Sequence, residues 1–133
     1  MDGRNALQTQ TYGAEARGSL AKSEVIISDG KIGFPAVRKC DILVAMNQEA
    51  LNTFMKDLKE TGTLIVDSTN VTTVPETKAK VYKIPITETF MLGALMRITN
   101  LVSKKAIEDA IKEDVSEKTV ETNINAFIRG LQL

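Results

Sequence analysis

The chain has 133 residues, 43% hydrophobic and 26% charged, a composition typical of one globular domain. Its 17 basic and 17 acidic residues give a formal net charge of zero, which argues against a nucleic-acid or acidic-membrane partner. With no histidine and one cysteine, it cannot form a Ser-His-Asp or Cys-His site, and a transition-metal or iron–sulfur site is unsupported.

The N-terminal part of the chain predicts two strands joined by a loop. Residues 5–11 form a short polar strand and residues 12–18 the loop. Residues 19–28 alternate with a period of two, which is typical of a half-buried strand, and Asp29-Gly30 is a turn dipeptide. We expect the strand at 19–28 to be antiparallel.

The loop carries the residues that point most directly to function. Gly13 and Gly18 suit turn geometry and close approach of another chain or ligand. Between them, Arg17 is suited to a phosphate group or to a carboxylate on a partner, or to a local ion pair with Glu15. Glu15 is equally a partner for backbone amides.

Tyr12, the first residue of the loop, and Gln10, in the strand before it, share its candidate role. Tyr12 is either part of an interface, where tyrosine is common, or a plug of the core beneath the loop. Gln10 is included with it as a ligand- or interface-binding residue.

A strand–helix–strand unit follows. Residues 41–46 form an apolar run typical of a strand buried on both faces, and Asn47 is a plausible N-cap. Apolar residues at helical spacing then extend to Leu58, and Gly62 suits the helix C-terminus. Residues 63–67 predict a second buried strand.

Polar side chains follow both buried strands at their carboxyl ends, where open α/β sheets bind ligands. Asn47 and Gln48 follow the first strand, and Ser68 follows the second, after Asp67. They are candidates to line one crevice. Capping of the helix by Asn47 and of the next turn by Asp67-Ser68 is the alternative.

The C-terminal half predicts one strand and three helices. Residues 80–84 form the strand, and a helix extends from Thr87 to about Val102. Ser103 and Ser116 are expected N-caps of two further helices. The fold class is therefore α/β, three-layered, with a mixed, mostly parallel sheet and flanking helices in one domain, residues 1–133. The βα unit with which doubly wound domains usually open is absent.

Several segments resemble the gamma subunit of 2-oxoacid:ferredoxin oxidoreductases, apart from that opening unit. The resemblance covers nearly the whole chain and is densest in the loop, Thr9-Gln10-Thr11-Tyr12-Gly13-Ala14-Glu15-Ala16-Arg17-Gly18. It continues through residues 21–29, 41–51 and 62–68, and through the closing helix around Phe127. The family has a longer segment before the helix that holds Leu92-Gly93-Ala94-Leu95.

The resemblance implies a subunit of an enzyme that converts a 2-oxoacid and coenzyme A to acyl-CoA and carbon dioxide. Thiamine diphosphate, Mg and iron–sulfur clusters are expected on partner alpha, beta and delta subunits, with ferredoxin as acceptor. This chain would contribute subunit interface and part of the coenzyme A path. No cofactor, membrane or nucleic acid is expected on it, and its lone cysteine favours the reducing cytoplasm. The alternatives are a stand-alone ligand-binding or assembly module and a subunit of an indolepyruvate-type enzyme.

Overall fold

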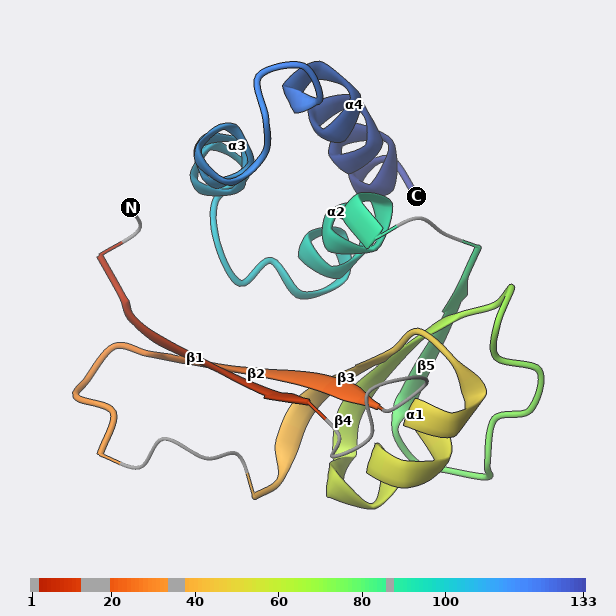
Figure 1. The fold of residues 1–133 in the computed structure, drawn as a ribbon. Coiled ribbons are helices and arrows are strands. Elements are labelled where there is room, and N and C mark those ends of the chain that lie inside the picture. The colour runs from red at the N-terminus through yellow and green to blue at the C-terminus, as the bar shows by residue number, and fades with distance from the viewer. Residues whose placement is uncertain (1–2, 13–19, 34–37, 86–87) are drawn as a thin grey trace. The chain divides into compact units, whose positions relative to one another are not determined.

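The computed structural model describes residues 3–12, 20–33, 38–85 and 88–133 and divides them into two compact units (Figure 1). We call residues 3–66 and 70–82 the strand unit, and residues 67–69 and 83–133 the helix unit. The strands are β1 (Asn5–Tyr12), β2 (Ala21–Ser28), β3 (Cys40–Ala45), β4 (Leu58–Asp67) and β5 (Lys80–Ile84). The helices are α1 (Gln48–Phe54), the short 3₁₀ helix η1 (Met55–Asp57), α2 (Glu88–Thr99), α3 (Lys104–Asp114) and α4 (Val120–Leu131).

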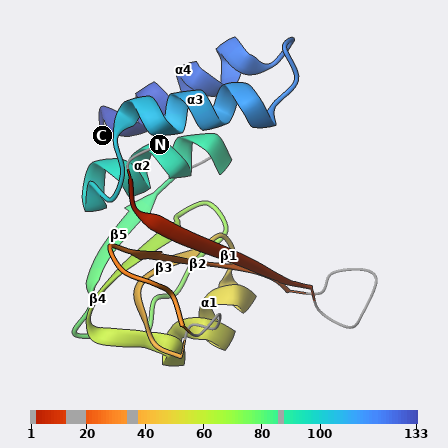
Figure 2. The same ribbon diagram turned by 90° about the vertical axis from the view of Figure 1, so that its left-hand side faces the viewer.

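The predicted α/β class is confirmed, with the described strands divided between two sheets. β1 and β2 form an antiparallel two-stranded sheet, and the other sheet has the order β3-β4-β5, with β3 and β4 parallel. We expected one mixed sheet. Instead, β1 and β2 pair only with each other among the described strands, from Asn5 opposite Ser28 to Tyr12 opposite Ala21. Figure 2 shows this long ribbon from the side.

The strand–helix–strand unit is confirmed, but its helix ends earlier than predicted. α1 stops at Phe54, one 3₁₀ turn follows, and Leu58 already begins β4. Gly62 is therefore not a helix cap. It lies inside β4, where a Cβ would come within 2.8 Å of the Asp41 carbonyl oxygen. The pairing of β3 with β4 shifts register at this point, so Gly62 serves close backbone approach at a bulge.

The core of the strand unit gathers around the carboxyl half of β4. Leu64, Ile65 and Val66 are fully buried there. This agrees with the continuous apolar run expected of a strand covered on both faces. Leu51 of α1 and Val71, from the segment after β4, pack in one cluster with Leu64 and Val66. In β3, Asp41 is exposed, and Cys40, Ile42, Leu43 and Val44 are only half-buried.

In the helix unit, α2 and α4 cross at two glycines. A Cβ at Gly93 would lie 2.1 Å from the Phe127 carbonyl oxygen, and one at Gly130 would lie 2.2 Å from the Phe90 carbonyl oxygen. The Gly93 and Gly130 backbones therefore approach more closely than any side chain allows. The Phe127 side chain is fully buried beside this crossing, in a cluster with Met96 of α2 and Ile111 of α3. Met91 of α2 is buried as well.

Two helix boundaries in this unit differ from prediction. α2 ends at Thr99, before the expected Val102, because Asn100 adopts a left-handed φ of 49° that terminates the helix. Ser103 caps α3 as predicted, its side chain accepting from the Ala106 N–H at 3.1 Å. Ser116 does not cap α4. Its carbonyl instead accepts from the Thr119 N–H, and the helix begins after that turn.

Candidate functional site

The β1–β2 hairpin leads to the loop that the sequence singles out. Gly13, Glu15, Arg17 and Gly18 lie outside the described residues, so their roles stay predictions. Gln10 lies opposite Ser23 and is exposed, and the backbone of Tyr12 ends β1 opposite Ala21. The hairpin is thus regular up to the last residue pair before the loop.

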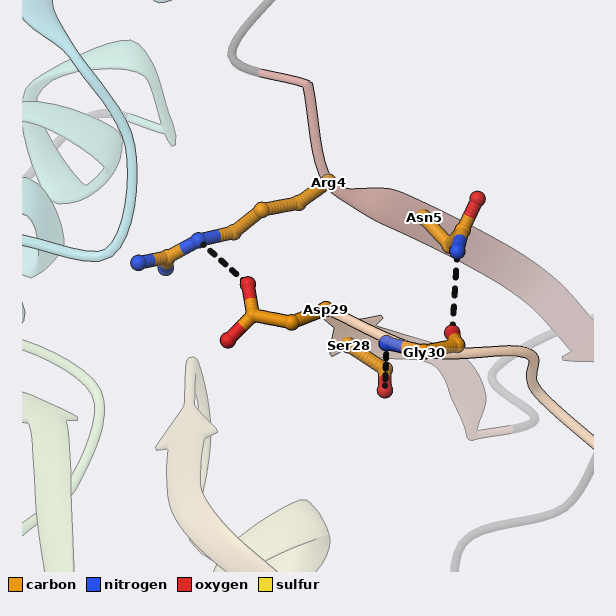
Figure 3. Close-up of polar contacts among 5 residues, drawn as sticks. All are labelled: Arg4, Asn5, Ser28, Asp29 and Gly30. Carbon is orange, nitrogen blue, oxygen red and sulfur yellow. Dashed lines mark hydrogen bonds and ion pairs between the residues drawn. The ribbon is translucent and has the colours of Figure 1, made fainter.

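Side chains fix the register at the other end of this hairpin (Figure 3). Asn5 Nδ2 donates to the Gly30 carbonyl at 2.9 Å, and Arg4 Nε lies 3.1 Å from Asp29 Oδ1. Ser28 Oγ accepts from the Gly30 N–H at 3.1 Å. A slip of one residue would break these contacts and send every strand side chain to the opposite face.

The two faces of the hairpin differ in chemistry. On one face, Leu7, Lys22, Glu24 and Ile26 are half-buried. Lys22 Nζ lies 2.7 Å from Glu24 Oε1 and 5.3 Å from the centre of the Phe54 ring in α1. This face therefore packs within the strand unit and carries the charged pair.

On the opposite face, Ile27 is half-buried, and the exposed residues are all uncharged: Ala6, Gln8, Gln10, Ala21, Ser23 and Val25. Val25 lies opposite Gln8 and is 57% exposed. Gln8 Nε2 donates to Ser23 Oγ at 3.1 Å across the same face. The alternation in the sequence predicts which residues share a face of the strand. It does not indicate that the face with Lys22 and Glu24 is the half-buried one.

Asn47 is the N-cap of α1, one of its two predicted roles. Its Oδ1 accepts from the Ala50 N–H at 2.8 Å, and its backbone has the extended conformation usual for a cap. The polar side chain that follows β3 is therefore used in starting the helix, and a ligand role for it stays a prediction.

Gln48 fastens the segment after β4 to α1. Its Oε1 accepts from the N–H groups of Thr72 and Thr73, both at 3.0 Å, and its Nε2 donates to the Thr73 carbonyl at 2.8 Å. Nε2 also lies 3.0 Å from Asn52 Oδ1. These partners fix the orientation of the amide, since a backbone N–H can only donate and a carbonyl can only accept. No local pattern in the sequence indicates Thr72 and Thr73, which follow Gln48 by 24 and 25 residues.

The end of β4 brings a buried carboxylate next to an exposed hydroxyl residue. Asp67 is only 1% exposed, and its Oδ1 accepts from the Thr69 N–H at 2.9 Å. The exposed Ser68 donates its backbone N–H to the Ile84 carbonyl at 2.9 Å. Asp67 thus holds the turn after β4, the capping alternative. Ser68 belongs to the helix unit and Gln48 to the strand unit, and a shared crevice stays a prediction.

Cys40 is half-buried at the start of β3 and packs against the core of the strand unit. Burial raises the pKa of its thiol above the ordinary 9.0, since desolvation disfavours the thiolate. A thiol of this kind is a poor nucleophile at neutral pH. Among the described residues, no three histidine, cysteine, aspartate or glutamate side chains gather as metal ligands. None of the described helices is long and apolar enough to cross a membrane.

Comparison with known proteins gives a match over the full chain. The family model described as pyruvate ferredoxin/flavodoxin oxidoreductase matches residues 1–133. The 2-oxoglutarate synthase subunit KorC of Methanocaldococcus jannaschii is 44% identical, over 99% of this chain and 79% of its own length. The ketoisovalerate oxidoreductase subunit VorA of Methanothermobacter marburgensis is 31% identical, over 96% of this chain but 29% of its own length.

A solved structure agrees with these relatives. The gamma subunit of a keto/oxoacid ferredoxin oxidoreductase from Geobacter sulfurreducens superposes with a TM-score of 0.84 at 39% identity. The match covers 98% of this chain and 80% of that one. The resemblance inferred from the loop and the strand segments is thereby confirmed, and the chain belongs to the pyruvate ferredoxin/flavodoxin oxidoreductase family.

Proposed function

We propose that this chain is the gamma subunit of a 2-oxoacid:ferredoxin oxidoreductase that oxidises 2-oxoglutarate with coenzyme A. The observation that carries the proposal is the match over the full chain to gamma-type subunits, in sequence and in fold. The relative named for 2-oxoglutarate is 44% identical and the one named for ketoisovalerate 31%. This difference favours 2-oxoglutarate among the substrates of the family.

The chain's own residues support a subunit that assembles with cofactor-bearing partners. It has no histidine and one cysteine, whereas an iron–sulfur cluster ordinarily needs four thiolate ligands. The donor set therefore does not fit a resident cluster. We place thiamine diphosphate, Mg and the clusters on alpha, beta and delta partner subunits, ferredoxin as the acceptor of the complex, and the complex in the cytoplasm.

The role proposed for this chain is to shape an interface and the path of coenzyme A through the loop at the end of the hairpin. β1 and β2 stay paired to Tyr12 and Ala21, so a regular two-stranded ribbon leads directly into that loop. Arg17 would meet a phosphate of coenzyme A or a carboxylate of a partner subunit, since a guanidinium binds either in a bidentate manner.

Anaerobic purification from the native cells tests the assignment. The tagged chain should recover larger subunits, and the recovered complex should reduce a viologen dye only when a 2-oxoacid and coenzyme A are both present. 2-Oxoglutarate should give a higher kcat/KM than pyruvate, 2-oxoisovalerate or indolepyruvate. Recovery of the chain alone, without activity, would refute the subunit assignment, and preference for another 2-oxoacid would refute the substrate.

A basic residue beyond the other end of the hairpin provides a matched control for the loop. Arg17→Ala should lower activity or assembly of the complex while the isolated chain stays folded. Lys31→Ala is the control, because Lys31 is an exposed basic residue that follows β2 at the end of the hairpin away from the loop. Equal activity and equal assembly for the two variants would contradict a functional role for Arg17.

A further inference from the structure

Few side-chain contacts attach the β1–β2 hairpin to the rest of the strand unit. None of the described side chains of either strand is buried, and neither strand pairs with a described strand of the β3-β4-β5 sheet. Among the described residues, no hairpin side chain belongs to the core cluster around Leu51, Leu64 and Val66. Segments with few buried apolar contacts open at a lower free energy than the core does.

The half-buried face of the hairpin contacts α1 through a charged residue. Lys22 Nζ lies 5.3 Å from the centre of the Phe54 ring and 2.7 Å from Glu24 Oε1, and the half-buried Leu7 and Ile26 share this face. The ion pair joins two residues of β2, so it stays whole when the hairpin moves away from α1. Both charges then regain water, which offsets the loss of the contact with Phe54. A charged inner face therefore makes opening easier than an apolar one would.

Contacts inside the hairpin extend along its whole length. The two strands pair over eight residues each. Gln8 Nε2 donates to Ser23 Oγ on the exposed face, and Asn5 Nδ2 donates to the Gly30 carbonyl at the open end (Figure 3). All of these bonds join residues of the hairpin and its adjoining turn to one another. They hold the two strands together as a ribbon whether or not the ribbon contacts α1.

The segment after β2 is suited to act as a hinge. Gly30 and Gly33 lie there, outside any helix or strand. A Cβ at Gly33 would meet nothing within 4 Å, and one at Gly30 would meet only Ser28 Oγ, at 4.0 Å. Hinges are short stretches that absorb changes in φ and ψ. The open space around these two glycines lets their backbone make such changes without a clash.

We propose that the β1–β2 hairpin is a hinged arm, which swings away from α1 as one paired ribbon while the β3-β4-β5 sheet stays folded. The arm carries the loop that contains Arg17, so the swing moves that loop relative to α1. The swing is a property of the chain alone. Its use, to bring the loop to a ligand or a partner subunit, rests on the proposed function.

Double electron–electron resonance between two spin labels measures the swing in the complete chain. Cysteines introduced at Val25 of β2 and Thr53 of α1 carry one pair of labels, and cysteines at Thr53 and Val81 of β5 carry a reference pair outside the arm. All three side chains are exposed, and Cys40→Ala removes the native thiol. The first pair should give two distances and the reference pair one narrow distance. One narrow distance for both pairs overturns the arm.

Two variants should shift the open fraction in opposite directions. Phe54→Ala removes the ring that Lys22 contacts, and it should raise the open fraction at least twofold. The double variant Lys22→Leu, Glu24→Leu makes the inner face apolar, so opening exposes apolar surface to water, and the open fraction should fall about fivefold. An open fraction that is the same in the parent chain and both variants overturns the role of this contact in closing the arm.

Hydrogen exchange distinguishes a swing from local unfolding, because a two-stranded hairpin on its own is only marginally stable. The paired amides of β1 and β2 should stay protected in Phe54→Ala as they are in the parent chain. Exchange as fast as that of an unpaired chain would show that the hairpin unfolds, and would overturn the swing of an intact ribbon.

The assembled complex tests the use of the arm. Partner subunits that hold the loop should convert the two distances between the labels at Val25 and Thr53 into one, since binding selects one of the two positions. Two distances in unchanged proportion after assembly overturn this use. A parent chain that recovers no subunit refutes the proposed function, while the distances in the chain alone still decide the swing.

Discussion

A methyl group added at the crossing of α2 and α4 should destabilise the helix unit. In Gly93→Ala the new Cβ would lie 2.1 Å from the Phe127 carbonyl oxygen and 2.9 Å from the Gly130 Cα. A relaxed carbon–oxygen contact is about 3.3–3.6 Å, so the two helices must separate by roughly 1 Å. The atoms in the way belong to the backbone and cannot rotate aside.

The expected cost follows from two opposing effects. Overpacking a close contact costs about 1–3 kcal/mol, and a rigid backbone neighbour places this site at the upper end. Alanine is favoured over glycine inside a helix by about 1 kcal/mol. The net loss should therefore be about 2 kcal/mol. Gly33→Ala is the control, since a Cβ there meets nothing within 4 Å, and it should be neutral or slightly stabilising.

Urea unfolding followed by far-ultraviolet circular dichroism measures the free energy of unfolding of each variant. Hydrogen exchange then locates the effect, which should appear in α2 and α4 and leave β1 and β2 unchanged. Gly130→Ala should behave alike, and the double variant should cost less than the two single variants together, because one separation relieves both clashes. A Gly93→Ala chain as stable as the parent would refute the close crossing.

Three further changes test the strand unit. Gln48→Leu should cost about 1 kcal/mol, since it removes the acceptor of the exposed Thr72 and Thr73 N–H groups and water can take its place. Hydrogen exchange at those two amides should accelerate, and unchanged exchange would contradict these hydrogen bonds. Asn47→Ala should cost about 1 kcal/mol through loss of the cap, measured by urea unfolding; no loss would show that the cap is dispensable. Burial raises the pKa of the Cys40 thiol above 9.0 in the folded chain, so the free energy of unfolding should be highest below pH 9.0 and should fall as the pH rises through the pKa of the folded state. Alkylation of Cys40 with iodoacetamide should have its midpoint above pH 9.0, and Cys40→Ala should lose the pH dependence of stability. An alkylation midpoint at or below pH 9.0 would contradict the raised pKa.

Features governed by neighbouring residues were predictable from the sequence. Asn47 and Ser103 were expected to be caps and both accept from the N–H three residues on, since capping needs only a short polar side chain and an extended backbone. Ser116 was predicted by the same rule and does not cap, because Thr119, three residues later, immediately precedes the helix and bonds back to it. With two candidates one turn apart, the local rule could not choose.

Features that depend on distant partners were not predictable. Gly62 suits a helix end or a strand bulge equally well, and only the approach of the Asp41 backbone decides between them. Gln48 was named as a candidate ligand or interface residue because it follows a buried strand. The amide partners that occupy it come from Thr72 and Thr73, well beyond any local pattern.

The hairpin shows how register determines which side chains a pair of strands exposes. A half-buried ion pair such as Lys22–Glu24 adds little net stability, since desolvation offsets much of the attraction. The inward position of these charges therefore follows from the pairing of the strands and not from the strength of the ion pair. The contacts of Arg4 and Asn5 at the open end fix that pairing, and a one-residue slip would turn both charges outward. The same contacts thus keep Val25 on the exposed face.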